Sequence, residues 1–281
     1  MDIRPSPIAG TWYSGNPDAL AGQLDGFLNA AESAKRPHPG ELIGVVVPHA
    51  GHRYSGAVAA GAFALMRGSA PEVVAVLSPM HTLAPAPLLT SGHDAYQTPL
   101  GTIPVDSDAV QALSTALEKR TGAGLFPIRN DREHSLEIEL PFLQRVLGGF
   151  RLLPVMILDQ RESTAQALGS ALAETLAGRK ALLVGSSDLS HFYPDPAARN
   201  LDSELMRRIV AFDPAGVMHA EEEEAGFACG RAAIAAVLWA ARELGADLVT
   251  PVAYANSGDV TGDKSSVVGY GSAAIWRRAA A

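Results

Sequence analysis

Short apolar runs alternate with longer amphipathic stretches along most of the chain. The runs are rich in valine, isoleucine and leucine, as expected for strands that are buried on both faces. They predict strands at residues 42–48, 71–79, 150–158, 180–188, 246–257 and 265–277. Between them, apolar residues recur at helical spacing, which predicts helices at 56–68, 106–120, 134–148, 163–179, 200–211 and 227–244.

This alternation is typical of an α/β domain with a mostly parallel central sheet and helices on both faces. The last two predicted strands are joined only by GDVTGDK, so we expect them to pair antiparallel and make the sheet mixed. The polar stretch 31–41 predicts a loop, and Pro141 predicts a kink or break in the helix at 134–148. The 281 residues fit one large domain, and we interpret 1–281 as a single one.

Composition and charge narrow the class of protein. Hydrophobic residues make up 47% of the chain and charged residues 19%, which is ordinary for a globular protein with a large core. The net charge of -8 and the absence of a basic stripe predict no nucleic-acid partner. No apolar run has the roughly 18 residues needed to span a bilayer, and the first residues lack the apolar core of a signal peptide. We therefore expect a cytoplasmic protein without a membrane partner, and the alanine-rich, lysine-poor composition fits a bacterial origin.

Polar side chains follow four of the predicted strands. Because ligands bind at the carboxyl ends of strands in open α/β sheets, we expect these side chains to share one crevice. Three histidines and an aspartate just past buried strands favour a common site over separate structural roles. The residues are His49 and His52 after the first strand, His81 after the second, Ser186, Ser187, Asp188 and His191 at and beyond the end of the fourth, and Tyr254, Asn256 and Asp259 at and beyond the end of the fifth.

The single cysteine, Cys229, has three possible roles: a small buried hydrophobe, a nucleophile or a metal ligand. It stands in GFACGR just before a predicted helix, where the helix dipole favours a thiolate. Two imidazoles and one thiolate would leave open coordination positions, which is the arrangement of a catalytic metal site. Iron, zinc and copper all accept such ligands.

Several long motifs, in this order along the chain, give it a family resemblance. PHAGHRYSG, SPMHT, EHSLEIELPFLQ, SSDLSH, CGR and YANSGDVTGDKSSVVGYG resemble the Memo family, whose bacterial members are called protein B of the AmmeMemoRadiSam system. The resemblance extends over nearly the whole chain. It implies the α/β fold of class III extradiol (LigB-like) dioxygenases, which use non-haem Fe(II), and a metal pocket formed by His49, His81 and Cys229.

The resemblance also places His134, Asp188 and His191 near the metal, where we expect them to have catalytic roles. His134 or His191 would act as general acid or base, since an imidazole titrates near neutral pH. Asp188 would either orient a histidine by accepting its ring N–H or cap the N-terminus of a helix.

Three further residues are expected to have no catalytic or metal-binding role. Many relatives carry an aromatic residue in place of His52, which is then either an added ligand or a surface residue, and we expect the surface. Glu137 and Glu139 are expected on the exposed face of the helix at 134–148.

Three functions fit these features. The first is a metal-dependent, dioxygenase-like oxidoreductase with Fe(II), or with copper or zinc. The second is a non-enzymatic metal- or peptide-binding scaffold that acts with AMMECR-type and radical SAM partner proteins. The third is a metal hydrolase. The ligand, a small molecule or a peptide, stays open.

Overall fold

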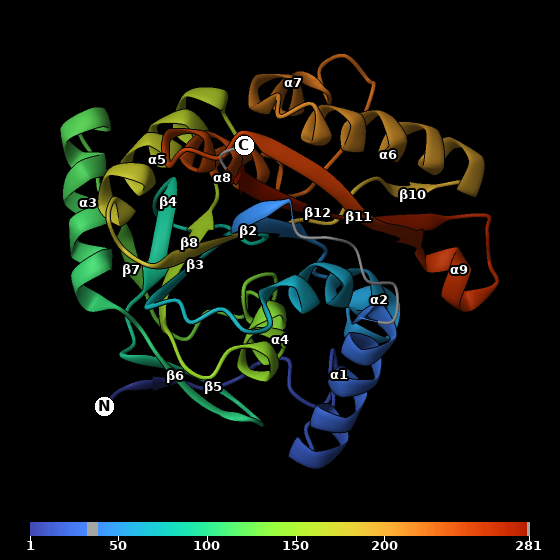
Figure 1. Ribbon diagram of the computed structural model, residues 1–281, viewed down its shortest axis with the longest axis horizontal. Coiled ribbons are helices and arrows are strands. Elements are labelled where there is room, and N and C mark those ends of the chain that lie inside the picture. Colours follow the sequence, from blue (N-terminus) through green and yellow to red (C-terminus); the bar gives the residue numbers. More distant parts are fainter. Residues whose placement is uncertain (33–38, 280–281) are drawn as a thin grey trace.

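The computed structural model describes residues 1–32 and 39–279, and its central layer is a nine-stranded mixed sheet (Figure 1). The strands run in the order β10-β12-β2-β9-β3-β8-β4-β7, and β11 also pairs with β12. Their bounds are β2 (Gly40–Val47), β3 (Val73–Pro79), β4 (Leu88–Ser91), β7 (Phe126–Ile128), β8 (Arg151–Ile157), β9 (Ala181–Ser186), β10 (His191–Tyr193), β11 (Leu248–Asn256) and β12 (Val267–Arg278).

The four strands in the middle of the sheet, β2, β9, β3 and β8, are parallel to one another. On one flank β12 is antiparallel to β2, and on the other β4 is antiparallel to β8. In β3 every residue is buried, and Ala75 pairs with Leu183 on one side and Leu153 on the other. A strand covered on both faces needs apolar residues at every position, which explains the continuous valine-rich runs.

Helices cover both faces of the sheet (Figure 1). Alternate strand residues serve different faces: Val46 packs into the cluster of α3, α5, α6, α7 and α8, whereas Val45 and Val47 pack into that of α1, α2 and α4. The helices are α1 (Pro17–Glu32), α2 (His52–Phe63), α3 (Ser107–Thr121), α4 (Leu140–Val146), α5 (Glu162–Leu176), α6 (Asp195–Val210), α7 (Pro214–His219), α8 (Arg231–Glu243) and α9 (Ser257–Thr261), with 3₁₀ turns η1 (Ala64–Met66) and η2 (Glu137–Glu139).

A small second sheet holds the N-terminal residues against the body of the protein. It consists of β1 (Ile3–Arg4), β5 (Ala95–Thr98) and β6 (Gly101–Pro104), with β1 parallel to β5. None of these strands was predicted, because each is too short to show a hydrophobic period.

Local sequence signals account for the ends of α3. Asp106 caps its N-terminus by accepting a hydrogen bond from the backbone N–H of Ala109 at 3.0 Å. Lys119 and Arg120 stand in its last turn, and Gly122 ends it in the left-handed region at φ 79°.

The prediction of a mixed α/β sheet is confirmed, with two differences in detail. β11 and β12 do pair antiparallel, but β12 also pairs with β2 and therefore lies inside the sheet. The predicted helix at 134–148 is wrong in extent: Pro141 stands in the first turn of α4, where its missing N–H leaves no bond unmade.

The predicted loop at 31–41 is too long at both ends, since β2 already begins at Gly40. Residues 31 and 32 belong to α1, and 33–38 lie outside the described residues. Helix α1 itself was missed, although its buried Leu20, Leu24 and Leu28 recur every four residues. In the part of the chain that the structure describes, no helix combines the length and the apolar character needed to cross a membrane.

Candidate metal centre

Three connections at the carboxyl end of the sheet carry polar residues at equivalent positions. His49, His81 and Asp188 each stand two residues beyond the end of their strand, which is β2, β3 and β9 respectively. In the sheet, β9 lies between β2 and β3. Residues far apart in the sequence therefore meet at one edge, as the sequence predicts.

Cys229 reaches this edge because Gly230 precedes α8. A Cβ atom at Gly230 would lie 2.5 Å from the carbonyl oxygen of Ser186 and 2.9 Å from the Cβ of Ser187. Only glycine lets the start of α8 approach the end of β9 so closely. As a result, the Sγ of Cys229 lies 3.1 Å from Nε2 of His49.

The side chains of His49, His81 and Cys229 form a set that could bind one metal ion. One nitrogen from each ring and the sulfur all lie within 4.8 Å of one another. An ion with bonds of about 2.1 Å to nitrogen and about 2.3 Å to sulfur joins donor atoms up to about 4.4 Å apart. Small side-chain adjustments would therefore let all three contact one ion, and both donor types are ordinary ligands of iron, zinc and copper.

Glu133 fixes the position of His81. Its Oε1 lies 3.0 Å from the ring Nδ1 of His81, and its Oε2 accepts a bond from the backbone N–H of His81 at 2.6 Å. It also accepts bonds from the backbone N–H groups of His134 and Ser135, at 2.9 Å each. Burial favours the neutral acid, but these bonds outweigh it and hold the pKa of Glu133 below its usual range. Nε2 of His81 is thus the nitrogen left for a ligand.

Glu133 could also join His81 and His134 in a second metal-binding group, since their donor atoms lie within 4.8 Å of one another. Its two oxygens, however, already accept several bonds from these residues. We interpret Glu133 as the carboxylate partner of a metal-binding histidine, an arrangement that fixes the orientation of the ring. Glu133 was not predicted as a site residue, although it directly precedes His134.

His49 is buried and held on two sides. Its Nδ1 lies 2.9 Å from Oγ of Ser186, and its backbone N–H donates to Oδ1 of Asp188 at 2.8 Å. Burial, reinforced by the neighbouring rings of His134 and His81, lowers its pKa well below the usual value. The ring is therefore neutral at pH 7, as a metal ligand must be.

Asp188 differs from both predicted roles. Its Oδ1 accepts bonds from the backbone N–H groups of His49 at 2.8 Å and Ala50 at 3.2 Å, so it orders the chain after β2. Among the described residues no histidine ring bonds to it, and the next helix along the chain, α6, begins at Asp195 with Pro194 in the capping position. Burial raises the pKa of Asp188 to about 7.

The expectation of a thiolate at Cys229 does not hold for the metal-free pocket. Burial raises the pKa of the thiol to about 12, and the nearby charge of Asp188 adds to this effect. Desolvation of the sulfur outweighs the dipole of α8. A nucleophilic thiolate is therefore disfavoured, whereas a bound cation would deprotonate the thiol.

His134 and His191 both line the pocket that His49 and His81 also line. The ring of His134 stacks on that of His81 at 4.8 Å between centroids, and burial lowers its pKa to about 4. Nδ1 of His191 lies 2.7 Å from the carbonyl oxygen of Leu189, so this nitrogen donates and Nε2 carries the lone pair. Burial lowers the pKa of His191 as well.

The pocket has a volume of about 490 Å³ and largely apolar walls. Trp12 was not predicted, because it lies outside any periodic element. The centroid of its ring lies 4.0 Å from that of His134. Tyr54, at the start of α2, lines the pocket too. The remaining lining residues are Thr11, Ala50, Gly51, Val268 and Tyr270.

The expected surface position of His52 is wrong. The side chain is buried and its ring lies between Tyr13 and Phe142, with centroid distances of 5.3 and 4.9 Å. Nε2 lies 2.9 Å from the carbonyl oxygen of Ile138, which it reaches as a donor. His52 begins α2 on its inner face, so it belongs to the core rather than to the metal centre.

Glu137 and Glu139 are also buried rather than exposed, with 0% and 1% of their surface accessible. They lie in η2, which turns them inward. Glu137 accepts hydrogen bonds from Arg4, Ser6 and the hydroxyl of Tyr13. Glu139 contacts Ser186.

The polar residues at and beyond the end of β11 have structural roles. Asn256 and Asp259 form a reciprocal capping box at the start of α9. The hydroxyl of Tyr254 donates to Asp202 at 2.7 Å. None of these residues lines the metal pocket.

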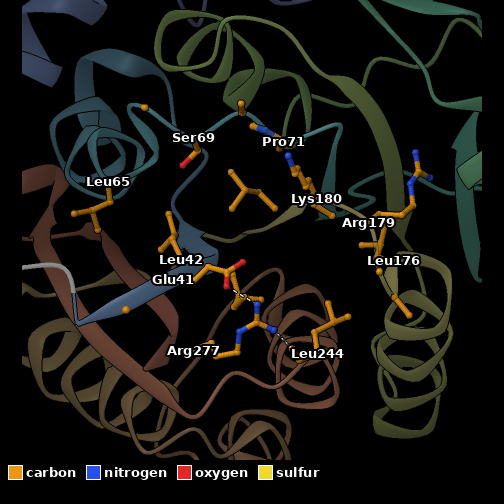
Figure 2. A pocket seen from close by; sticks show the side chains of 18 of the residues that line it. Glu41, Leu42, Leu65, Ser69, Pro71, Leu176, Arg179, Lys180, Leu244 and Arg277 are labelled. Atoms are coloured by element: carbon orange, nitrogen blue, oxygen red, sulfur yellow. Dashed lines mark hydrogen bonds and ion pairs between the residues drawn. The ribbon is translucent and has the colours of Figure 1, made fainter. Parts of the chain in front are cut away.

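A second hollow, of about 870 Å³, lies at the opposite edge of the sheet, beside the starts of β2 and β9 (Figure 2). Its charged groups are largely paired: Arg277 binds Glu41, and Arg179 binds Asp106 at 2.7 Å. It contains none of the metal-binding groups found among the described residues. The metal-capable side chains are therefore concentrated at the carboxyl edge.

Comparisons with known proteins agree with the motifs. Residues 4–274 match the family model described as Memo-like protein. A MEMO1 family protein of Methanothermobacter thermautotrophicus is 35% identical over 95% of this chain and 98% of its own. A relative from Methanopyrus kandleri is 35% identical over 98% of this chain and 99% of its own. One from Pyrobaculum aerophilum is 31% identical over 99% of this chain and 100% of its own. The chain belongs to the Memo-like protein family.

Proposed function

We propose that this protein is a metal-dependent oxidoreductase whose ion, Fe(II) in the first place and copper or zinc otherwise, is held by His49, His81 and Cys229. One observation carries the proposal: the three donor side chains lie within 4.8 Å of one another beside a pocket. Three protein ligands leave room in the coordination sphere for a substrate, as in catalytic sites.

The surrounding residues would prepare this site for chemistry. An iron ion bound there would supply Lewis acidity and a redox couple. Glu133 holds the ring of His81 and Asp188 holds the backbone of His49, so both histidines stay in place. His134 and His191, neutral at pH 7 because burial lowers their pKa values, each offer a lone pair that accepts a proton from a bound substrate.

The walls of the pocket favour a small, flat substrate. A volume of about 490 Å³ is typical of sites for small molecules. Trp12, Tyr54 and Tyr270 offer aromatic surface, while the polar groups gather at the metal end. An aromatic ring with neighbouring hydroxyl groups fits both features.

The test begins with anaerobically purified protein, elemental analysis and oxygen uptake with a catechol as probe. We expect about one ion per chain, bound at least tenfold more weakly in His49→Ala and Cys229→Ala. His219→Ala is a matched control, because His219 is exposed and pairs with Glu162 away from the pocket. Absence of bound metal, or unchanged affinity in both ligand variants, would refute the proposal.

A second candidate, a non-enzymatic scaffold that binds a peptide, rests on the exposed apolar side chains next to the pocket. Leu83, 99% exposed, follows His81 by two residues, and Phe192, 75% exposed, follows His191 directly. Phe192 also has a left-handed backbone at φ 66°, which is unfavourable for an aromatic residue. Such exposed surface is typical of protein contacts.

The partners of a scaffold would be the AMMECR-type and radical SAM proteins that the resemblance suggests. Bound metal without turnover of any small molecule would favour this function. Bound zinc with release of acid and no oxygen uptake would instead favour a metal hydrolase.

A further inference from the structure

The hydroxyl of Ser186 lies behind His49, on the side of the ring away from Cys229. Its Oγ makes three short contacts: 2.9 Å to Nδ1 of His49, 2.7 Å to the carbonyl oxygen of Ser135 and 2.7 Å to Oε1 of Glu139. Ser186 and Glu139 are both buried, so bulk water does not compete for these bonds. The three contacts must share the protons that these groups themselves carry.

Counting protons decides the direction of the bond to His49. A serine hydroxyl has one proton to donate and can accept two bonds. If Ser186 donated to His49, its oxygen and the carbonyl oxygen of Ser135 would face each other at 2.7 Å with no proton between them. A buried contact of that kind is costly. The ring must therefore supply its own proton at Nδ1 and donate to Ser186.

Glu139 completes the arrangement. As a neutral acid it would donate to Ser186, whose own proton would go to Ser135, so that each of the three contacts holds one proton. Burial raises the pKa of Glu139 well above its usual value, and the charge of Asp188 adds to this, which favours the neutral acid. Among the described residues no cation pairs with Glu139 to oppose it.

We propose that Ser186, held by Glu139 and by the carbonyl of Ser135, is a positioning residue that keeps His49 in the tautomer protonated at Nδ1. The lone pair of Nε2 then faces Cys229, 3.1 Å away. This inference rests on the proposed function, because it gives the tautomer its purpose: Nε2 is the atom that would bind the metal. The sequence marked Ser186 only as a polar residue after a strand.

The experiment reads the tautomer directly, in metal-free protein. A long-range proton–nitrogen correlation spectrum of the imidazole rings distinguishes the two tautomers, and a His49→Gln variant assigns the signals. We expect His49 to be protonated at Nδ1 in the wild type and to lose this preference in Ser186→Ala. Glu139→Gln, whose amide can still bond to Ser186, should keep it.

Affinity for Co(II) provides a second readout, followed through the absorption of the bound ion. Loss of an outer partner of a metal ligand costs about 10- to 100-fold in affinity, so Ser186→Ala should bind Co(II) that much more weakly. Ser272→Ala is the matched control: Ser272 is equally buried and donates to the carbonyl of Val58 at 2.9 Å, away from the site. It should change neither the tautomer nor the affinity.

The outcomes separate this inference from the proposed function. Protonation of His49 at Nε2 in the wild type would overturn the inference, as would a Ser186→Ala variant that behaves like Ser272→Ala. If the tautomer behaves as expected but no metal binds to the wild type, the proposed function fails while the role of Ser186 in fixing the ring is supported.

Discussion

His52 makes a pH-dependent contribution to stability that follows from its surroundings. Burial lowers the pKa of its ring from 6.5 to about 4, and the bond to the carbonyl of Ile138 opposes this only in part. The unfolded chain therefore binds a proton at a higher pH than the folded protein does. Stability from this group is present above pH 6.5 and is lost as the pH falls toward the folded pKa.

The size of the loss follows from the two pKa values. Between about pH 7.5 and about pH 5, the group should lower the free energy of unfolding by about 2 kcal/mol. His52→Phe should remove this dependence. Phenylalanine suits the site because Tyr13 and Phe142 pack on the ring, and Nδ1 of His52 is buried with no hydrogen-bond partner in the described chain. Loss of the bond to Ile138 should cost about 1 kcal/mol at every pH.

Urea unfolding of the metal-free wild type and of His52→Phe at both pH values tests this reasoning. The quantity of interest is the difference between the two proteins in their change with pH, because all other titrating groups are common to both. We expect the variant to lose about 2 kcal/mol less than the wild type on acidification. Parallel losses in the two proteins would mean that His52 does not carry the predicted pKa shift.

Three further predictions concern packing, buried charge and the ion. Gly230→Ala should force the start of α8 away from β9, because the added Cβ would clash with the backbone, and should weaken Co(II) binding at least tenfold. Gly22→Ala, which has open space around the added Cβ, should leave Co(II) binding unchanged in the same titration. Arg4→Ala should lower the free energy of unfolding, measured in urea, by about 3–5 kcal/mol, because it leaves Glu137 buried without its cation. Arg67→Ala, which removes a half-exposed ion pair with Glu32, should lower it by less than about 1 kcal/mol. A chelator should lower the melting temperature of the loaded protein, with a loss of about 2.7 kcal/mol in the free energy of unfolding if free metal was at 100 times its dissociation constant. The same treatment should cost His49→Ala at most about 1.4 kcal/mol, because this variant binds the ion at least tenfold more weakly.

The sequence predicted well the features that depend on local pattern. The β-branched runs located the strands of the sheet core, and the polar residues just beyond them located one edge of the sheet. His49 and His81 could be predicted as site residues because each is an imidazole that closely follows a buried strand. Cys229 was assigned to the same site from the family resemblance of the motifs, because hydrophobic periodicity gives no signal for it.

Residues whose positions depend on distant partners were not predictable in this way. A charged residue in an amphipathic stretch ordinarily faces water, yet Glu137 is buried because Arg4, more than 130 residues away, binds it. Glu139 is buried against Ser186 in the same manner. The 3₁₀ turn before Pro141 changes which side chains face inward, so a helical period assigned these residues to the wrong face.

The place of β12 in the sheet has a consequence for synthesis of the chain. This strand pairs with β2, β10 and β11, yet it is the last of them to leave the ribosome. Until β12 is synthesised, the side of β2 that pairs with it has unpaired backbone groups, and so does the side of β11 that pairs with it. Ribosome-bound chains that stop before residue 267 should therefore expose hydrogen-bonding strand edges and depend on chaperones, even though the parallel strands at the centre are already complete.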